Sequence, residues 1–171
     1  ACSDTGIPLG AALYGYHHIL NRPKSDALTS PFTGPTYDHG RIEDAAAAFD
    51  GYRVVRGGEK AVRAQALALL CANKILGHFQ GRSEMGPRAL GNRSILMSPL
   101  EAGNKDILND RVKHREPFRP FAPAVLEERA HEYFVLDRPS PYMLLVPEVV
   151  EAKRAVIPAI THVDGTARVQ T

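Results

Sequence analysis

Apolar residues recur at helical spacing in the middle of the chain. Between residues 58 and 73 the apolar positions include Val62, Ala66, Leu69 and Leu70. This is the i, i+4, i+7, i+8 spacing of one helical face. The pattern predicts a helix over 58–73 with that face turned towards the core.

Four other segments are predicted to be helical from their composition and end signals. Residues 6–20 are rich in small residues, and Asp4 or Thr5 can cap their amino end. The remaining three are the alanine-rich segment 42–51, which ends at Gly51, and the segments 101–112 and 128–134.

Short apolar runs bounded by turn residues predict strands. These runs are 52–56, 75–81 (expected to be buried), 94–97, 142–146 and 155–163. Residues 21–40 collect prolines and glycines and are read as a linker. Helices and strands interleave, which favours the α/β (α+β) class with a mixed sheet.

Composition narrows the class of protein. The chain has 171 residues with 44% hydrophobic composition, which fits one globular domain or one domain with a fragment of its neighbour. No apolar run approaches the length of a membrane span, and the first residues lack the features of a signal peptide. We therefore expect a cytoplasmic location. Cys2 and Cys71 have no motif spacing, and we assign them no chemistry.

The positive charge is concentrated in one stretch. Residues 82–119 contain eight Lys or Arg against five Asp or Glu, whereas the whole chain has a net charge of +2. A polyanion such as nucleic acid usually requires a broad basic face. The local excess therefore fits a compact anion, with phosphate as the first choice.

The segment GRSEMGPRALGNRS, residues 81–94, has the composition of an anion-binding loop. It contains three glycines, three arginines, a proline and a glutamate. Glycine lets backbone N–H groups approach a ligand, and arginine binds phosphate bidentately. The spacing matches neither a P-loop nor a dinucleotide-binding turn, so a solvated structural loop stays open as the alternative.

The segment RVKHREPFRPFAP, residues 111–123, places cations in a loop stiffened by prolines. If the segment is extended, alternate positions share one side. That side would carry Lys113, Arg115 and Arg119, with Phe118 and Phe121 anchoring the other side in the core. A basic surface strand is the alternative.

Other candidates rest on single residues. Arg168 follows the small-residue turn in THVDGTARVQ, residues 161–170, and a surface ion pair is its default role. Asp4 is by default a helix cap. His17 and His18 are adjacent on a helix and cannot chelate one metal together.

Five ordered blocks resemble the O-carbamoyltransferase family of nodulation-factor and antibiotic biosynthesis. They are SDTGIPLGAAL, GRSEMGPRALGNRSIL, KHREPFRPFAPAVLEE, SPYML and PAITHVDGTARVQT. Their common order makes the resemblance more specific than any single loop. Where relatives often carry a tryptophan, this chain has His78, which we interpret as a neutral core histidine.

The resemblance implies a piece of a larger enzyme. Residues 1–22 would be the tail helix of a preceding actin-like ATPase-superfamily domain, and residues 23–40 a linker. Residues 41–171 would form a YrdC-like domain, truncated at its carboxyl end, with a twisted mixed sheet flanked by helices.

The resemblance also implies the chemistry. Family members form carbamoyladenylate from carbamoyl phosphate and ATP and then transfer the carbamoyl group to a substrate hydroxyl in the partner domain. Arg88, Lys113 and Arg119 would be catalytic and, with Arg168, would bind carbamoyl phosphate and ATP. Asp4 matches an Fe²⁺ ligand whose companion histidines lie outside this chain, and Mg²⁺ can accompany ATP.

Two alternatives to catalysis stay open. A YrdC-like module can hold a nucleotide or RNA without chemistry through the same basic loops. A purely structural linker would bind no phosphate. We expect the isolated segment to have no carbamoyltransferase activity. Most contacts to the acceptor would come from the absent domain.

Overall fold

The computed structural model describes residues 6–24 and 30–171. The chain divides into two compact units. Unit 1 comprises residues 1–57 and 78–94, and unit 2 comprises residues 58–77 and 95–171. Residues 41–171, which the sequence assigns to one domain, therefore contribute to both units, and the predicted domain boundaries stay a prediction.

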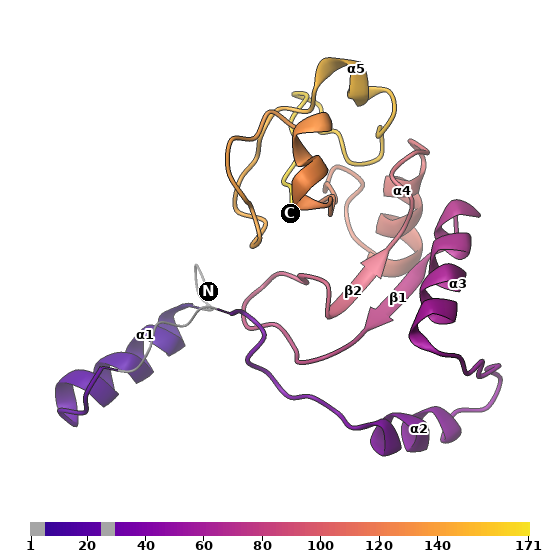
Figure 1. Cartoon of the computed structure of the whole chain (residues 1–171). Coiled ribbons are helices and arrows are strands. Elements are labelled where there is room, and N and C mark those ends of the chain that lie inside the picture. Colours follow the sequence, from indigo (N-terminus) through magenta and orange to yellow (C-terminus); the bar gives the residue numbers. More distant parts are fainter. Residues whose placement is uncertain (1–5, 25–29) are drawn as a thin grey trace. The chain divides into compact units, whose positions relative to one another are not determined.

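Unit 1 begins with helix α1, Gly6–Tyr14, and a π-helical turn, Gly15–Ile19 (Figure 1). Helix and turn together confirm the predicted helix. Helix α2 spans His39–Ala47, with the Asp38 carboxylate accepting a 2.8 Å hydrogen bond from the Arg41 N–H at its amino end. Residues 21–24 and 30–38 have no helix or strand, as expected for a linker.

The sheet has two strands, β1 at Leu76–Phe79 and β2 at Arg93–Leu96, which run in opposite directions (Figure 1). Residues of β1 alternate between half-buried and exposed. The expectation of a buried strand is therefore wrong, since a strand covered on one face alternates in this way. His78 is half-buried, with Nδ1 2.6 Å from the Gly91 carbonyl oxygen, and is not a core histidine.

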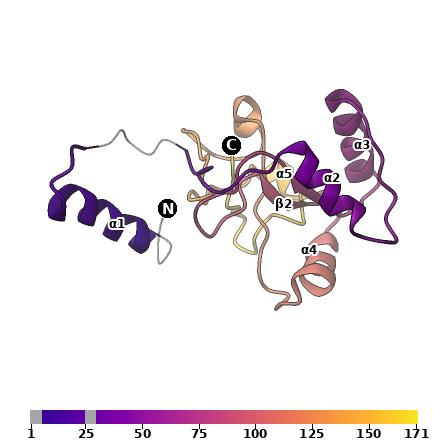
Figure 2. The same cartoon turned by 90° about the horizontal axis from the view of Figure 1, so that it is seen from below.

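Helix α3, Glu59–Cys71, confirms the strongest prediction, but none of its residues is buried. Val62 is 52% exposed, whereas Ala66 and Leu70 are half-buried, so the apolar face is only partly covered by the described residues. Helix α4, Asn104–Leu108, continues into a π-helical turn, Asn109–Lys113, and the two form one coil (Figure 2). They overlap the helix predicted over 101–112, starting three residues later and ending one residue beyond it.

Two short helices follow in unit 2. A 3-10 helix, Glu127–Glu132, occupies most of the segment expected to be helical at 128–134, and α5 spans Glu151–Arg154. The core lies around them. It consists of buried apolar side chains from the last third of the chain, namely Phe134, Val149, Ile157, Ile160, Ala167 and Val169.

Three predicted strands are wrong. Residues 52–56 and 142–146 contain no strand, and Met143 has a φ of 53°, which interrupts an extended run. Residues 155–163 form successive turns after α5, in which the N–H of Ile157 bonds the Lys153 carbonyl. β-Branched composition favoured strands here, but strands also need a neighbouring strand to pair with.

The remaining β pairing consists of isolated bridges and forms no further strand among the described residues. Isolated bridges join Ala124 to Gln170 in parallel, and Phe134 to Val149 and Glu148 to Thr166 in antiparallel. Helices with a small sheet agree with the α/β class at a coarse level, whereas the described residues show no mixed sheet beyond two strands. The YrdC-like likeness and the actin-like assignment of α1 stay predictions. No helix among the described residues is long and apolar enough to span a membrane.

Candidate functional site

The loop between β1 and β2 in unit 1 closes on its own glutamate. Glu84 Oε1 accepts hydrogen bonds from the backbone N–H groups of Leu90 (2.8 Å), Asn92 (2.8 Å) and Arg93 (3.2 Å). The Gly91 N–H donates instead to Ser94 Oγ at 3.0 Å. The backbone amides that we expected to contact an anionic ligand therefore already bind a side-chain carboxylate.

Two opposing effects set the pKa of the Glu84 carboxyl. Partial burial raises its pKa, and the backbone N–H groups of Leu90, Asn92 and Arg93 lower it by more. The net pKa lies below the ordinary value for glutamate, because each N–H bond favours the charged form. The loop thus contains a permanent internal anion at neutral pH.

The three arginines of residues 81–94 have different roles. Arg82 donates to the carbonyls of Thr33 and Gly34, both at 3.0 Å. Arg93 donates to backbone carbonyls of the same loop, and its guanidinium carbon lies 3.6 Å from the centre of the Phe79 ring. These two arginines hold the loop in shape.

Arg88 differs from both. Its side chain is exposed, and it makes no hydrogen bond or ion pair with the residues at positions 6–24 and 30–171. The loop that carries it is fixed at several points by Glu84, Arg82 and Arg93. Arg88 is therefore the arginine of this loop that is available to an external anion.

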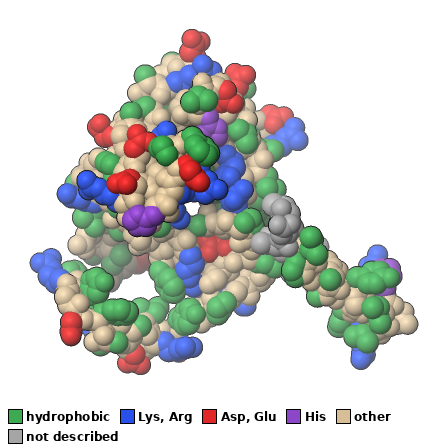
Figure 3. Space-filling view, turned by 180° about the vertical axis from the view of Figure 1, so that it is seen from behind, with side chains coloured by type: hydrophobic (Ala, Val, Ile, Leu, Met, Phe, Trp, Pro, Cys, Tyr) green, Lys and Arg blue, Asp and Glu red, His purple; other side chains and the backbone are tan. Residues whose placement is uncertain are grey.

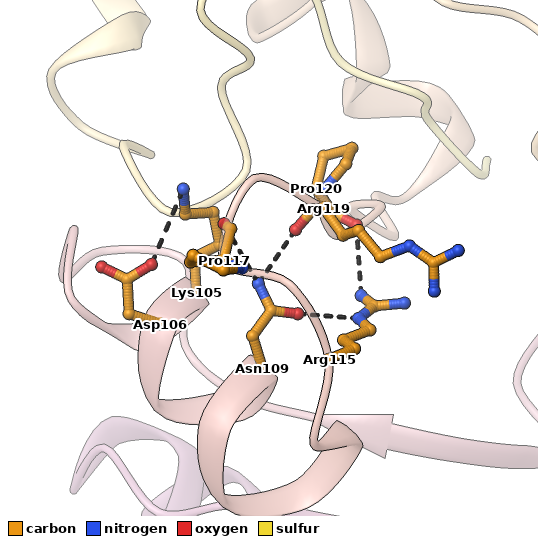
Figure 4. A network of polar contacts seen from close by, with 7 residues as sticks. All are labelled: Lys105, Asp106, Asn109, Arg115, Pro117, Arg119 and Pro120. Carbon is orange, nitrogen blue, oxygen red and sulfur yellow. Dashed lines mark hydrogen bonds and ion pairs between the residues drawn. The ribbon is translucent and has the colours of Figure 1, made fainter.

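The second basic loop, in unit 2, is not an extended strand. It leaves the π-helical turn at His114, which has a left-handed φ of 45°. Arg115 then folds back onto Asn109, with Nε 2.7 Å from Asn109 Oδ1 (Figure 4). The expectation that Lys113, Arg115 and Arg119 share one side through strand alternation is therefore wrong.

The two aromatic residues that were predicted to anchor this loop differ in burial. Phe121 is half-buried against the core cluster, as expected, and its ring centre lies 4.7 Å from the Arg115 guanidinium carbon. Phe118 is 78% exposed, so its predicted burial is wrong. The tight turn around Pro117 directs Phe118 outward, which alternation along a strand did not anticipate.

Lys113 and Arg119 remain at the surface. Lys113 is exposed and makes no hydrogen bond or ion pair with any residue that the structure describes. Arg119 Nε lies 3.5 Å from Glu116 Oε2, with a side chain 53% exposed. A pair this exposed contributes little to stability, so a phosphate can replace the carboxylate at small cost.

Arg168 follows a turn near the end of the chain. It is half-buried between Ala167 and Val169, both of which are fully buried. Gly165 in the preceding turn has a φ of 80°, and a Cβ there would lie 2.7 Å from the Arg154 guanidinium carbon. The glycine is thus required both by the backbone conformation and by the close arginine.

The same turn contains a linked set of polar groups. Asp164 Oδ1 accepts from the Thr166 hydroxyl at 2.7 Å and from the Thr166 N–H at 3.0 Å, and these bonds lower the pKa of the Asp164 carboxyl. His162 Nδ1 lies 3.1 Å from the same hydroxyl oxygen. Burial lowers the pKa of His162, Asp164 raises it, and the charge of Arg168 lowers it further.

Asp4, the candidate metal ligand, lies outside the described residues. Within residues 6–24 and 30–171, no group of three or more His, Cys, Asp or Glu side chains is placed to hold a metal ion. The described residues therefore do not fit an iron site by themselves.

The four predicted cations belong to two different units. Arg88 lies in unit 1, and Lys113, Arg119 and Arg168 lie in unit 2. Their convergence on one anion stays a prediction. Figure 3 shows Lys and Arg side chains interspersed with Asp and Glu on the face in view.

Sequence reasoning missed two residues that shape these loops. Glu84 was counted as one member of a glycine-rich motif, although its carboxylate closes the loop. Asn109, only 1% exposed, was not singled out at all. An amide at the end of a short helix, close before a proline-rich loop, was the available signal.

Comparison with known proteins adds independent information. Residues 67–171 match the protein family described as "Carbamoyltransferase C-terminus". The chain is 43% identical over 175 residues to nodulation protein NolNO of Sinorhizobium fredii, covering 100% of this chain and 26% of that protein. It is 42% identical over 175 residues to nodulation protein NolO of Bradyrhizobium diazoefficiens, covering 100% of this chain and 32% of that protein.

A third relative matches over a shorter region. Nodulation protein U of Sinorhizobium fredii is 47% identical over 104 residues, which is 61% of this chain and 18% of that protein. The chain spans a third or less of the length of these relatives.

Proposed function

Because this chain belongs to the family of carbamoyltransferase C-terminal domains, we propose that it binds carbamoyl phosphate and ATP and supports the formation of carbamoyladenylate. In this reaction water releases inorganic phosphate from carbamoyl phosphate to give carbamate. A carbamate oxygen then attacks the α-phosphorus of ATP, and pyrophosphate leaves. The carbamoyl group is finally transferred to a hydroxyl of a small-molecule acceptor in a partner domain of the same polypeptide.

The observation that carries the proposal is the division of roles among the cations of each loop. Arg82 and Arg93 fix one loop and Arg115 fixes the other through internal hydrogen bonds. Arg88 and Lys113 remain exposed and unengaged by the residues that the structure describes. Rigid loops that present uncommitted cations suit phosphate recognition, because little entropy is lost when the anion binds.

Cations are sufficient for the chemistry proposed. Phosphoryl and adenylyl transfers depend mainly on positioning and on neutralising the charge that builds on oxygen atoms. Arg88, Lys113, Arg119 and Arg168 would hold the phosphate groups, and Mg²⁺ bound with ATP would neutralise part of their charge. Asp4 would complete an iron site only with ligands from the partner domain.

Calorimetric titration of the chain with carbamoyl phosphate, with and without ATP, tests the proposal. We expect saturable binding of carbamoyl phosphate that weakens modestly between low and moderate salt. Binding of RNA with a steep salt dependence, and none of carbamoyl phosphate, would instead favour a non-catalytic nucleic-acid module. Absence of binding to both would leave a structural role.

A further inference from the structure

The loop that follows Lys113 and carries Arg119 is held by one buried amide. Asn109 is 1% exposed, and its side chain is directed entirely at this loop (Figure 4). Its Nδ2 donates to the carbonyl of Arg119 at 3.0 Å and to that of Pro117 at 3.4 Å. Its Oδ1 accepts from Arg115 Nε at 2.7 Å. A buried amide is stable only when its donors and acceptor are satisfied, and this loop satisfies all of them.

The backbone of Asn109 reinforces the same contact. Its carbonyl accepts the N–H of Arg115 at 3.1 Å, across the left-handed residue His114. A left-handed conformation is unfavourable for a residue other than glycine and persists where neighbouring contacts determine it. Asn109 thus bonds to the loop just after the reversal and again four residues further on, at Arg119.

Arg115 is a partner of this amide rather than an available cation. Besides its bond to Asn109, its Nη2 lies 3.4 Å from the Pro120 carbonyl, and its guanidinium stacks on Phe121. Its charge and its hydrogen-bonding edge are therefore used within the loop. The exposed cations Lys113 and Arg119 stand on either side of it in the sequence.

We propose that Asn109 and Arg115 are positioning residues, which fix the 114–120 loop so that Lys113 and Arg119 are held ready for the phosphate group. The inference rests on the proposed function and adds to it a distinction between cations of the same motif. Lys113 and Arg119 contact the anion, and Arg115 does not. Asn109 acts on the anion through the loop alone.

The chain provides a matched control for the test. Asn104 is also 1% exposed and lies on α4, five residues earlier. Its amide bonds Asn73 and the Ser98 carbonyl and does not contact the 114–120 loop. Loss of either amide removes a buried hydrogen-bonded group from the same helix, so Asn109→Ala and Asn104→Ala are expected to reduce stability to a similar degree.

The experiment measures carbamoyl phosphate binding by calorimetry for both variants, well below their unfolding temperatures. We expect Asn109→Ala to weaken binding by about tenfold or more, because small displacements of positioning groups have large effects. Asn104→Ala should bind within about twofold of the unaltered chain. Equal loss in both variants, or loss in neither, would overturn the positioning role.

A second measurement does not depend on the ligand. Exchange of the Arg115 Nε proton, followed by NMR, should be at least about tenfold faster in Asn109→Ala than in Asn104→Ala, because only the first removes its acceptor. Unchanged exchange would refute the inference even if binding fell. If the unaltered chain binds no carbamoyl phosphate while the exchange result holds, the proposed function fails and the fixing of the loop by Asn109 stands.

Discussion

The carboxylate of Glu84 accepts a 2.8 Å hydrogen bond from the backbone N–H of Asn92, and this contact closes the loop that presents Arg88. Two further N–H groups share the same oxygen atom. The negative charge therefore stabilises the loop before any ligand binds. If this loop binds phosphate as proposed, the Arg88 side chain would make the contact, since three backbone amides of the loop already bind Glu84.

Replacing Glu84 by Gln should destabilise the chain by about 1–3 kcal/mol, because three bonds to a charged acceptor become bonds to a neutral one. Chemical denaturation at pH 7 measures the loss. The pKa of Glu84 is lowered in the folded state. Its stabilisation is therefore complete above the pKa of an unfolded glutamate, about 4.3, and disappears as the pH falls through the lower folded value. A gap between the two proteins that persists at pH 2 would contradict this account.

Replacing Arg88 by Ala should abolish carbamoyladenylate formation in the polypeptide that contains this chain. Arg88 is exposed in the chain without ligand, so the loss of its charge costs about 2–5 kcal/mol, or tens- to thousands-fold in rate, if the bound phosphate is desolvated. Pyrophosphate release is the measurement, and Lys113→Ala should behave in the same way. Arg63→Ala is the control, since Arg63 is an exposed cation on α3 paired with Glu59. Release at the unaltered rate in Arg88→Ala would reject the assigned role.

Replacing Arg115 and replacing Lys113 should have different effects on the free energy of unfolding. Arg115→Ala removes a side chain bonded to Asn109 and stacked on Phe121, and it should lower the free energy of unfolding by about 1–3 kcal/mol. Lys113→Ala should change it by less than about 0.5 kcal/mol, because its side chain is exposed. Urea denaturation of both variants distinguishes them. A larger loss for Lys113→Ala would show that the loop is held differently.

His162 should make stability depend on pH near neutrality. Burial, partly opposed by Asp164 and aided by the charge of Arg168, lowers its pKa in the folded state below 6.5. As the pH is lowered, His162 is therefore protonated in the unfolded chain before it is protonated in the folded chain. The free energy of unfolding falls as the pH drops through 6.5 towards the folded pKa. We expect the difference in unfolding free energy between pH 7.5 and pH 5.5 to be smaller in His162→Gln than in the unaltered chain. An identical pH dependence would exclude this histidine as a source.

Removing the Phe134 ring should have the largest effect on stability. Phe134 is 2% exposed and packs in the core cluster of unit 2. Phe134→Ala leaves a cavity and should cost about 3–5 kcal/mol. Phe118→Ala is the comparison, because Phe118 is 78% exposed and should change stability by less than about 0.5 kcal/mol. Similar losses for the two, measured by chemical denaturation, would contradict the core described here.

The sequence by itself determined the family and most of the helices, although the short helix α5 was not predicted. The helical period at Val62, Ala66 and Leu69 predicted α3, and the ordered motif blocks indicated the carbamoyltransferase family, which the comparisons confirm. Both signals are local in the chain: hydrophobic spacing follows the turn of a helix, and a motif is read from consecutive residues. The cationic character of residues 82–119 was likewise available from residue counts.

The tertiary structure decided which of these residues are committed to the fold. Composition does not distinguish Arg88 from Arg82, Arg93 and Arg115. In the structure the latter three donate hydrogen bonds to carbonyls and amides that lie up to 49 residues away. The strands predicted from 142–146 and 155–163 failed for a related reason, since an apolar run becomes a strand only beside another strand. Pairing and hydrogen bonding between distant residues are properties of the folded chain, and no local pattern contains them.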